Sequence, residues 1–121
     1  MEDVRRAAAA LHQRGARSVV ITGGDFEPVP GKAIDLVSTA GGAQMEEFAT
    51  YKIASRNTHG TGCAFSTSLA VNLALGHALP EAVNRAKKYI REAIRTAESL
   101  GSGVGPVNHF VPQDAVQKFL K

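Results

Sequence analysis

Apolar residues recur at helical spacing over two stretches of this chain. Between Glu2 and Arg14 they predict a helix that stops at Gly15. A second amphipathic stripe predicts a longer helix that begins at Pro80, because proline suits the first helical position, and ends at Gly101. One face of each helix should therefore pack against a core.

Other apolar runs are unbroken. Residues 63–75 are apolar almost all round, which predicts a helix buried between layers, with Gly76 at its C-terminal end. The β-branched run 18–22 predicts a short strand covered on both faces, and such strands favour a parallel sheet. A helix followed by a buried strand is half of a βαβ unit, so the pattern indicates an α/β fold.

The remaining segments predict a hairpin and a last helix. Residues 25–32 carry two prolines and a glycine and should form a loop. Segments 33–39 and 45–53 predict two strands joined at Gly41-Gly42. Residues 112–120 predict a short final helix.

Composition narrows the class of protein. A chain of 121 residues with 44% hydrophobic residues forms one ordinary globular domain, 1–121. Acidic residues are interspersed with the basic ones in the second amphipathic helix, so we expect a solvated face and no nucleic-acid partner. No apolar run reaches membrane-spanning length, and the charged start lacks the pattern of a signal peptide. The single cysteine excludes a disulfide within the chain, and we expect a cytoplasmic protein.

The candidate chemistry lies at Gly60, Thr61, Gly62 and Cys63. Glycines let backbone amides approach a ligand closely, and a helix start attracts anions. The same field should lower the pKa of a thiol there, so Cys63 could accept a proton from an attacking hydroxyl. A plain glycine turn followed by a small buried cysteine explains this spacing equally well, and both interpretations stay open. We expect His12, near the end of the first helix, to be solvated.

The sequence Asn-Thr-His-Gly-Thr-Gly-Cys at 57–63, followed by Phe65-Ser66, resembles the hydroxymethylpyrimidine/phosphomethylpyrimidine kinases of thiamine biosynthesis, in the ribokinase-like superfamily. The resemblance continues in Gly-Pro-Val-Asn-His-Phe at 105–110. Upstream, Val-Val-Ile-Thr-Gly-Gly-Asp at 19–25 resembles the strand and turn that approach the nucleotide.

The resemblance implies ATP-dependent phosphorylation of hydroxymethylpyrimidine and of its monophosphate. Cys63 would be the general base, and the amides of Gly60, Thr61, Gly62 and Cys63 would form the anion hole. Thr22, Gly23 and Gly24 would lie near ATP. Thr22 departs from the lysine often found at that position, and threonine lacks the point charge with which a lysine would contact phosphate.

The implied fold is a ribokinase-like three-layer α/β/α sandwich, of which this chain would be the C-terminal portion. Mg²⁺ ligands are then expected outside the chain, with no metal-binding residue inside it. An isolated portion should be inactive and should expose apolar surface, which favours a homo-oligomer or a partner chain. Two alternatives remain: a pyridoxal or other vitamin or sugar kinase of the superfamily, and a non-catalytic half-domain that binds nucleotide or a partner.

Overall fold

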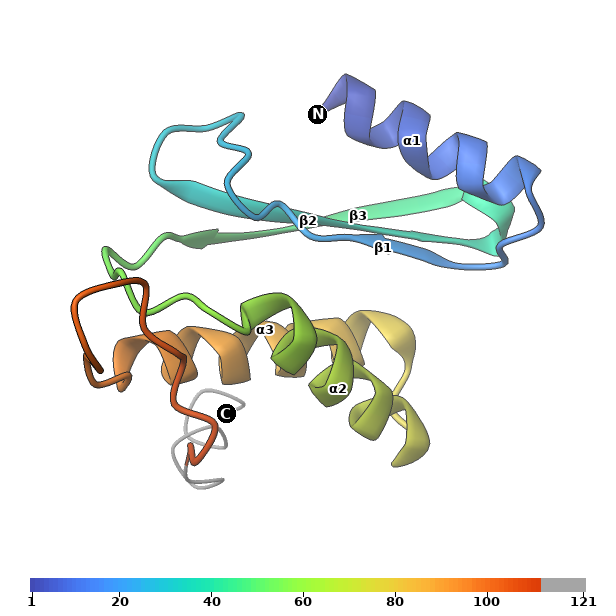
Figure 1. The fold of residues 1–121 in the computed structure, drawn as a ribbon. Coiled ribbons are helices and arrows are strands. Elements are labelled where there is room, and N and C mark those ends of the chain that lie inside the picture. Colours follow the sequence, from blue (N-terminus) through green and yellow to red (C-terminus); the bar gives the residue numbers. More distant parts are fainter. Residues whose placement is uncertain (112–121) are drawn as a thin grey trace. The chain divides into compact units, whose positions relative to one another are not determined.

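A computed structural model describes residues 1–111 of the chain (Figure 1). The helix predicted over 112–120 lies outside the described residues. Contacts divide the chain into two compact units, Met1–Lys52 and Ile53–Lys121. Each unit has its own set of buried residues. The prediction that 1–121 forms a single partial kinase domain stays a prediction.

The first unit consists of one helix and a three-stranded sheet, with strand order β1-β2-β3. Both strand pairs are antiparallel, and Val37 of β2 lies opposite Val20 on one side and Glu46 on the other. The helix lies along one face of the sheet, as Figure 1 shows. The elements are α1 (Glu2–Gln13), β1 (Val19–Ile21), β2 (Lys32–Thr39) and β3 (Gln44–Tyr51).

The core of this unit forms where α1 meets the sheet. Ala8, Val19 and Leu36 are buried together there. β2 is the most buried strand, because it has a neighbour on each side and the helix over one face. The predicted hairpin is confirmed, whereas parallel pairing of the first strand is wrong within the described residues. A short buried run does not reveal strand direction, and here the partner is the adjacent hairpin.

The glycine predicted to stop α1 does so. Gly15 has a φ of 101° and donates to the carbonyl of His12 at 2.9 Å, while Ala16 donates to the carbonyl of Leu11 at 3.2 Å. These two bonds satisfy the last helical carbonyls in a Schellman arrangement. The chain then enters β1, which together with β3 forms the edges of the described sheet.

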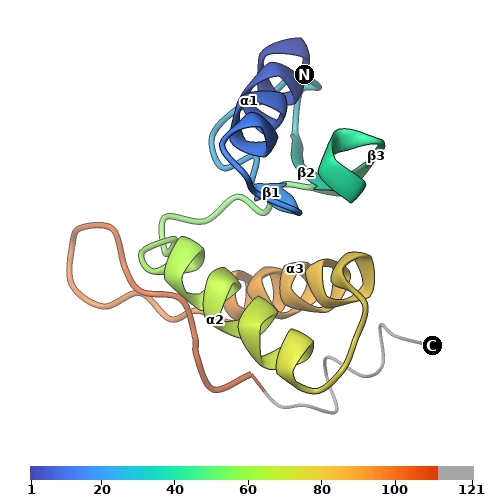
Figure 2. The same ribbon diagram turned by 90° about the vertical axis from the view of Figure 1, so that its right-hand side faces the viewer.

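Up to residue 111, the second unit is built on two helices, α2 (Thr61–Ala74) and α3 (Leu79–Arg95), which pack side by side (Figure 2). Gly76, with a φ of 91°, ends α2 as predicted by donating to Leu73. The predicted burial of α2 on all sides is wrong for the described residues, because α3 covers only one side of it. Large apolar side chains at Val71, Leu73 and Leu75 are exposed. No helix in residues 1–111 is long and apolar enough to cross a membrane.

The end of α3 differs from the prediction. The helix stops at Arg95 rather than at Gly101. The side chain of Thr96 donates to the carbonyl of Glu92 at 2.8 Å, and the amide of Asn108 donates to the carbonyl of Ala93 at 3.0 Å. The last turn is therefore capped by a residue from the returning chain, which local sequence does not reveal.

Candidate functional site

The predicted turn lies where α2 begins. Gly60 is the N-cap residue, with φ 89° and ψ 3°, a left-handed conformation that glycine adopts without strain. The amide of Thr61 donates to the carbonyl of Thr58 at 3.3 Å, and that of Ala64 donates to the carbonyl of Gly60 at 2.9 Å. The turn is thus closed by its own backbone, and the helix follows directly.

Free amides remain at this helix start. Those of Gly60, Gly62 and Cys63 have no acceptor among residues 1–111. Gly62 and Cys63 are also exposed, and the thiol of Cys63 is free. Unpaired amides at the positive end of a helix dipole attract anions. The structure therefore brings together the four residues proposed for the anion hole, and it places the proposed base among them.

A returning segment holds the residue before this turn. The amide of His59 donates to the carbonyl of Gly105 at 3.0 Å, and the amide of Val107 donates to the carbonyl of His59 at 3.2 Å. The two segments form a short parallel bridge between His59 and Pro106. Sequence reasoning singled out both segments by resemblance but did not predict that they pair, since no local pattern signals a contact at that separation.

The three residues expected near ATP follow β1 in the first unit. Thr22 and Gly24 are exposed, whereas Gly23 is held against β2. A Cβ on Gly23 would lie 2.9 Å from the backbone nitrogen of Ile34 and nearer still to its carbonyl oxygen. The amide of Gly23 donates to Oδ1 of Asp35 at 2.9 Å. Glycine at 23 is therefore required by close backbone approach, and Asp35 is a buried partner that sequence reasoning missed.

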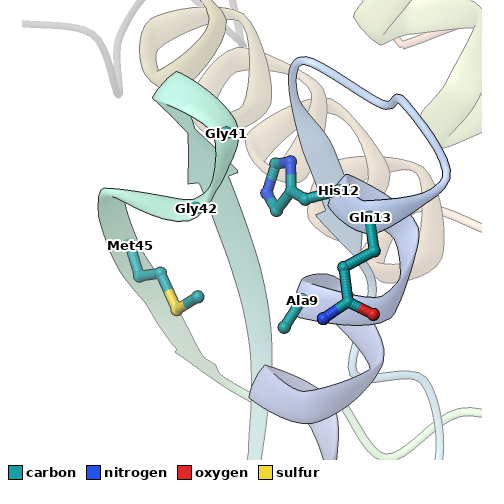
Figure 3. A pocket seen from close by; sticks show the side chains of 6 residues that line it. All are labelled: Ala9, His12, Gln13, Gly41, Gly42 and Met45. Carbon is teal, nitrogen blue, oxygen red and sulfur yellow. The ribbon is translucent and has the colours of Figure 1, made fainter.

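His12 lines a shallow hollow in the first unit, where its ring makes structural hydrogen bonds (Figure 3). Nδ1 of His12 pairs with the carbonyl of Ala16 at 2.7 Å, and Nε2 pairs with Oγ of Ser38 at 2.8 Å. The expectation that His12 is solvated is wrong, because its ring ties the end of α1 to β2. The hollow is lined by Ala9, His12, Gln13, Gly41, Gly42 and Met45.

The carboxyl groups whose pKa values are shifted lie outside the turn at residues 60–63. A hydrogen bond from Arg95 is the main reason that the pKa of Glu92 lies below its ordinary value. The pKa of Glu27 is lowered chiefly by Lys52, and that of Glu81 chiefly by Arg85. Residues 1–111 contain no group of three or more His, Cys, Asp or Glu side chains that could hold a metal ion.

The start of α2 therefore presents a glycine turn with free backbone amides beside an exposed thiol. Residues 1–108 match the family model described as phosphomethylpyrimidine kinase, and the chain belongs to that family. The fold is accordingly ribokinase-like, as the resemblance implied.

Curated relatives support the assignment. The chain is 45% identical over 116 residues to the thiamine biosynthesis bifunctional protein ThiED of Geobacter sulfurreducens, covering 96% of this chain and 23% of that protein. It is 40% identical over 107 residues to the hydroxymethylpyrimidine/phosphomethylpyrimidine kinase of Streptomyces coelicolor, covering 88% and 38%. The chain therefore spans less than half the length of these relatives.

Solved structures with the same fold include pyridoxal kinases. An ADP complex of the Bacillus subtilis enzyme is 36% identical, with a TM-score of 0.80 over 90% of this chain and 40% of that one. The Staphylococcus aureus enzyme in complex with AMP-PCP and pyridoxal is 32% identical, with a TM-score of 0.81 over 89% and 39%. These relatives are kinases crystallised with adenine nucleotides or their analogues.

Proposed function

We propose that this chain supplies the phosphoryl-binding turn and the general base of a cytoplasmic kinase of thiamine biosynthesis. The reaction would transfer a phosphoryl group from ATP to hydroxymethylpyrimidine or to its monophosphate. One observation carries the proposal: the free amides of Gly62 and Cys63 lie beside an exposed thiol at the start of α2, in a chain of this family.

Each residue of the turn has a distinct proposed role. The amides of Gly60, Gly62 and Cys63 would neutralise charge on the transferred group, because phosphoryl transfer is stabilised mainly by positioned donors. The amide of Thr61 is already bonded to Thr58, so Thr61 shapes the turn more than it binds. The thiolate of Cys63 would take the proton from the substrate hydroxyl as its oxygen attacks phosphorus.

Thr22, Gly23 and Gly24 are proposed as nucleotide-binding residues. The hydroxyl of Thr22 and the amide of Gly24 would contact the nucleotide there without the charge that a lysine provides, and Gly23, whose amide is bonded to Asp35, would hold the turn in place. Mg²⁺ would neutralise charge on the phosphates, with its ligands outside this chain.

A second candidate is phosphorylation of pyridoxal. The solved relatives at 32–36% identity are pyridoxal kinases, and one of them holds pyridoxal. The names of the curated relatives favour the pyrimidine. Phosphorylation rates with the two substrates distinguish the candidates.

A chimera tests the proposal most directly. In it, residues 1–111 replace the matching segment of the Streptomyces coelicolor kinase, and ADP release is measured with the pyrimidine and with pyridoxal. Cys63→Ser should lower kcat by about 10²- to 10⁴-fold, the usual contribution of a general base. Thr67→Ser, at an exposed position of the same helix, is the matched control. An unchanged kcat in Cys63→Ser contradicts the assignment of the base.

A further inference from the structure

Four consecutive residues, Gly105–Asn108, connect the start of α2 to the end of α3, and we call them the clasp. At one end, the carbonyl of Gly105 and the amide of Val107 bond the amide and carbonyl of His59, at 3.0 and 3.2 Å. At the other, the amide of Asn108 bonds the carbonyl of Ala93 at 3.0 Å. His59 directly precedes the N-cap Gly60, so the clasp fixes the backbone on which the turn begins.

The side chain of Asn108 strengthens the second attachment. Its Nδ2 donates to Oγ1 of Thr96 at 3.1 Å, and that hydroxyl donates to the carbonyl of Glu92 at 2.8 Å. The clasp is thus anchored through both backbone and side chain to the last turn of α3. A displacement at this anchor would be transmitted along four residues to His59.

Asn57 occupies the space beside Gly105. It is only 5% exposed, and its Nδ2 donates to Oγ of Ser99 at 3.2 Å. A Cβ on Gly105 would lie 3.0 Å from Cγ of Asn57 and closer still to its Oδ1. A side chain at 105 would therefore displace either Asn57 or the clasp itself.

We propose that the clasp sets the geometry of the phosphate-binding turn and that Gly105 is a positioning residue for it. Without a Cβ at 105, Asn57 and the carbonyl of Gly105 can both approach closely enough for the His59 bonds to form. The turn then takes the conformation in which the amides of Gly62 and Cys63 stay unpaired. That the turn binds phosphate rests on the proposed function. That the clasp sets the conformation of the turn does not depend on that function.

Amide hydrogen exchange and thiol chemistry test this control without kinase activity. The amide of Ala64 reports the turn, because it donates to the carbonyl of Gly60. In Gly105→Ala its exchange should be faster by about tenfold, because a local clash favours local opening. The reaction rate of Cys63, the chain's one cysteine, with an aromatic disulfide reagent should change as well. The amide of Ala82, at the start of α3, should keep its protection.

Gly103→Ala is the matched control. A Cβ there meets nothing within 4 Å, so the same chemical change in the same loop should leave both readouts unchanged. Equal behaviour of the two variants overturns the proposal. Uniform loss of protection throughout the chain also overturns it, because it indicates a purely structural effect. If Gly105→Ala does not fold, Asn108→Ala loosens the clasp without adding atoms, and unchanged readouts in that variant overturn the proposal.

A double variant identifies the source of the effect. In Asn57→Ala/Gly105→Ala the overlapping amide is absent, so the increase in Ala64 exchange should be smaller than the product of the two single increases. Independent effects contradict the role given to Asn57. A titration with inorganic phosphate, followed by the amide shifts of Gly62 and Cys63, separates the two proposals. If the turn is clasp-dependent but does not respond to phosphate, the proposed function fails and the positioning role of Gly105 stands.

Discussion

Oδ1 of Asp35 accepts a hydrogen bond from the amide of Gly23 at 2.9 Å, and Asp35 is only 5% exposed. A buried carboxylate on β2 thus fixes the turn that leaves β1. Gly23 in turn leaves no room for a side chain, because the backbone of Ile34 lies against it. The central strand β2 therefore holds the turn after β1 in place through a hydrogen bond and through close backbone contact.

Gly23→Ala should destabilise the first unit. Its Cβ would overlap backbone rather than a flexible side chain, and such overpacking costs about 1–3 kcal/mol in the free energy of unfolding. Urea denaturation measures the loss. Gly103→Ala, with open space around it, should change the free energy of unfolding little. Equal stability of the two variants would contradict the close approach seen at Gly23.

Gly62→Ala should raise the stability of the chain while weakening its binding of ATP. Nothing lies within 4 Å of a Cβ at this position in α2, and alanine is favoured over glycine in a helix by about 0.5–1 kcal/mol. The variant should therefore melt at a higher temperature. Its methyl group should also hinder an anion from reaching the free amides, so ATP should bind more weakly in a calorimetric titration. Unchanged affinity would argue against an anion site here.

Glu92→Gln should weaken the pH dependence of stability. The pKa of Glu92 is lowered from 4.5 in the folded chain, mainly by the hydrogen bond from Arg95. A lowered folded-state pKa contributes stability above pH 4.5, and that contribution disappears as the pH falls through the folded-state value. The variant should thus lose more stability near neutral pH than in strong acid.

Thermal melting across this pH range checks the difference for Glu92. Glu98→Gln, an exposed position just beyond α3, is the matched control for losing one negative charge. An equal loss of stability by Glu92→Gln at both ends of the range would contradict the role of the Arg95 hydrogen bond.

Exposed apolar side chains on and just after α2 should drive association. Val71, Leu73 and Leu75 are exposed, with Leu75 at 72%, and exposed apolar surface favours self-association or a partner. Light scattering at micromolar concentration should show a species larger than one chain. Val71→Ser/Leu75→Ser should shift it toward monomer, whereas Phe110→Ser, on another exposed apolar residue, should not. A clean monomer of the unmodified chain would contradict the prediction.

The chain by itself should release no ADP in a coupled kinase assay. It spans 38% of the Streptomyces coelicolor kinase, and the resemblance to such kinases places the Mg²⁺ ligands outside it. The control is the chimera described above, in which the same turn sits within a longer kinase. Turnover by the isolated chain that disappears in Cys63→Ala would overturn this prediction.

Local sequence predicted most element boundaries because their causes are local. Gly15 and Gly76 end helices through their own positive φ values, and Pro80 lies in the first turn of α3. The hairpin followed from two strand-forming runs joined at Gly41-Gly42. In each case the determining residues lie within a few positions of the boundary, so a local pattern was enough.

Two features that the sequence did not predict depend on partners distant in the chain. Gly101 does not end α3, because Thr96 and Asn108 cap the helix earlier. The turn at Gly60 was predicted as an anion site from its glycines, yet its support from Gly105 was not. That support depends on backbone pairing and on the volume of Asn57, and neither produces a periodic pattern of residues in the sequence.

The two edges of the sheet are chemically unequal. β3 carries Glu46 and Glu47 at exposed positions, and charged residues on an edge strand discourage another strand from adding to it. β1 offers only Val19, Val20 and Ile21, with no charge to discourage such an addition. The two edges therefore differ in how readily they accept another strand: the charges on β3 disfavour one, whereas β1 offers it a short apolar template.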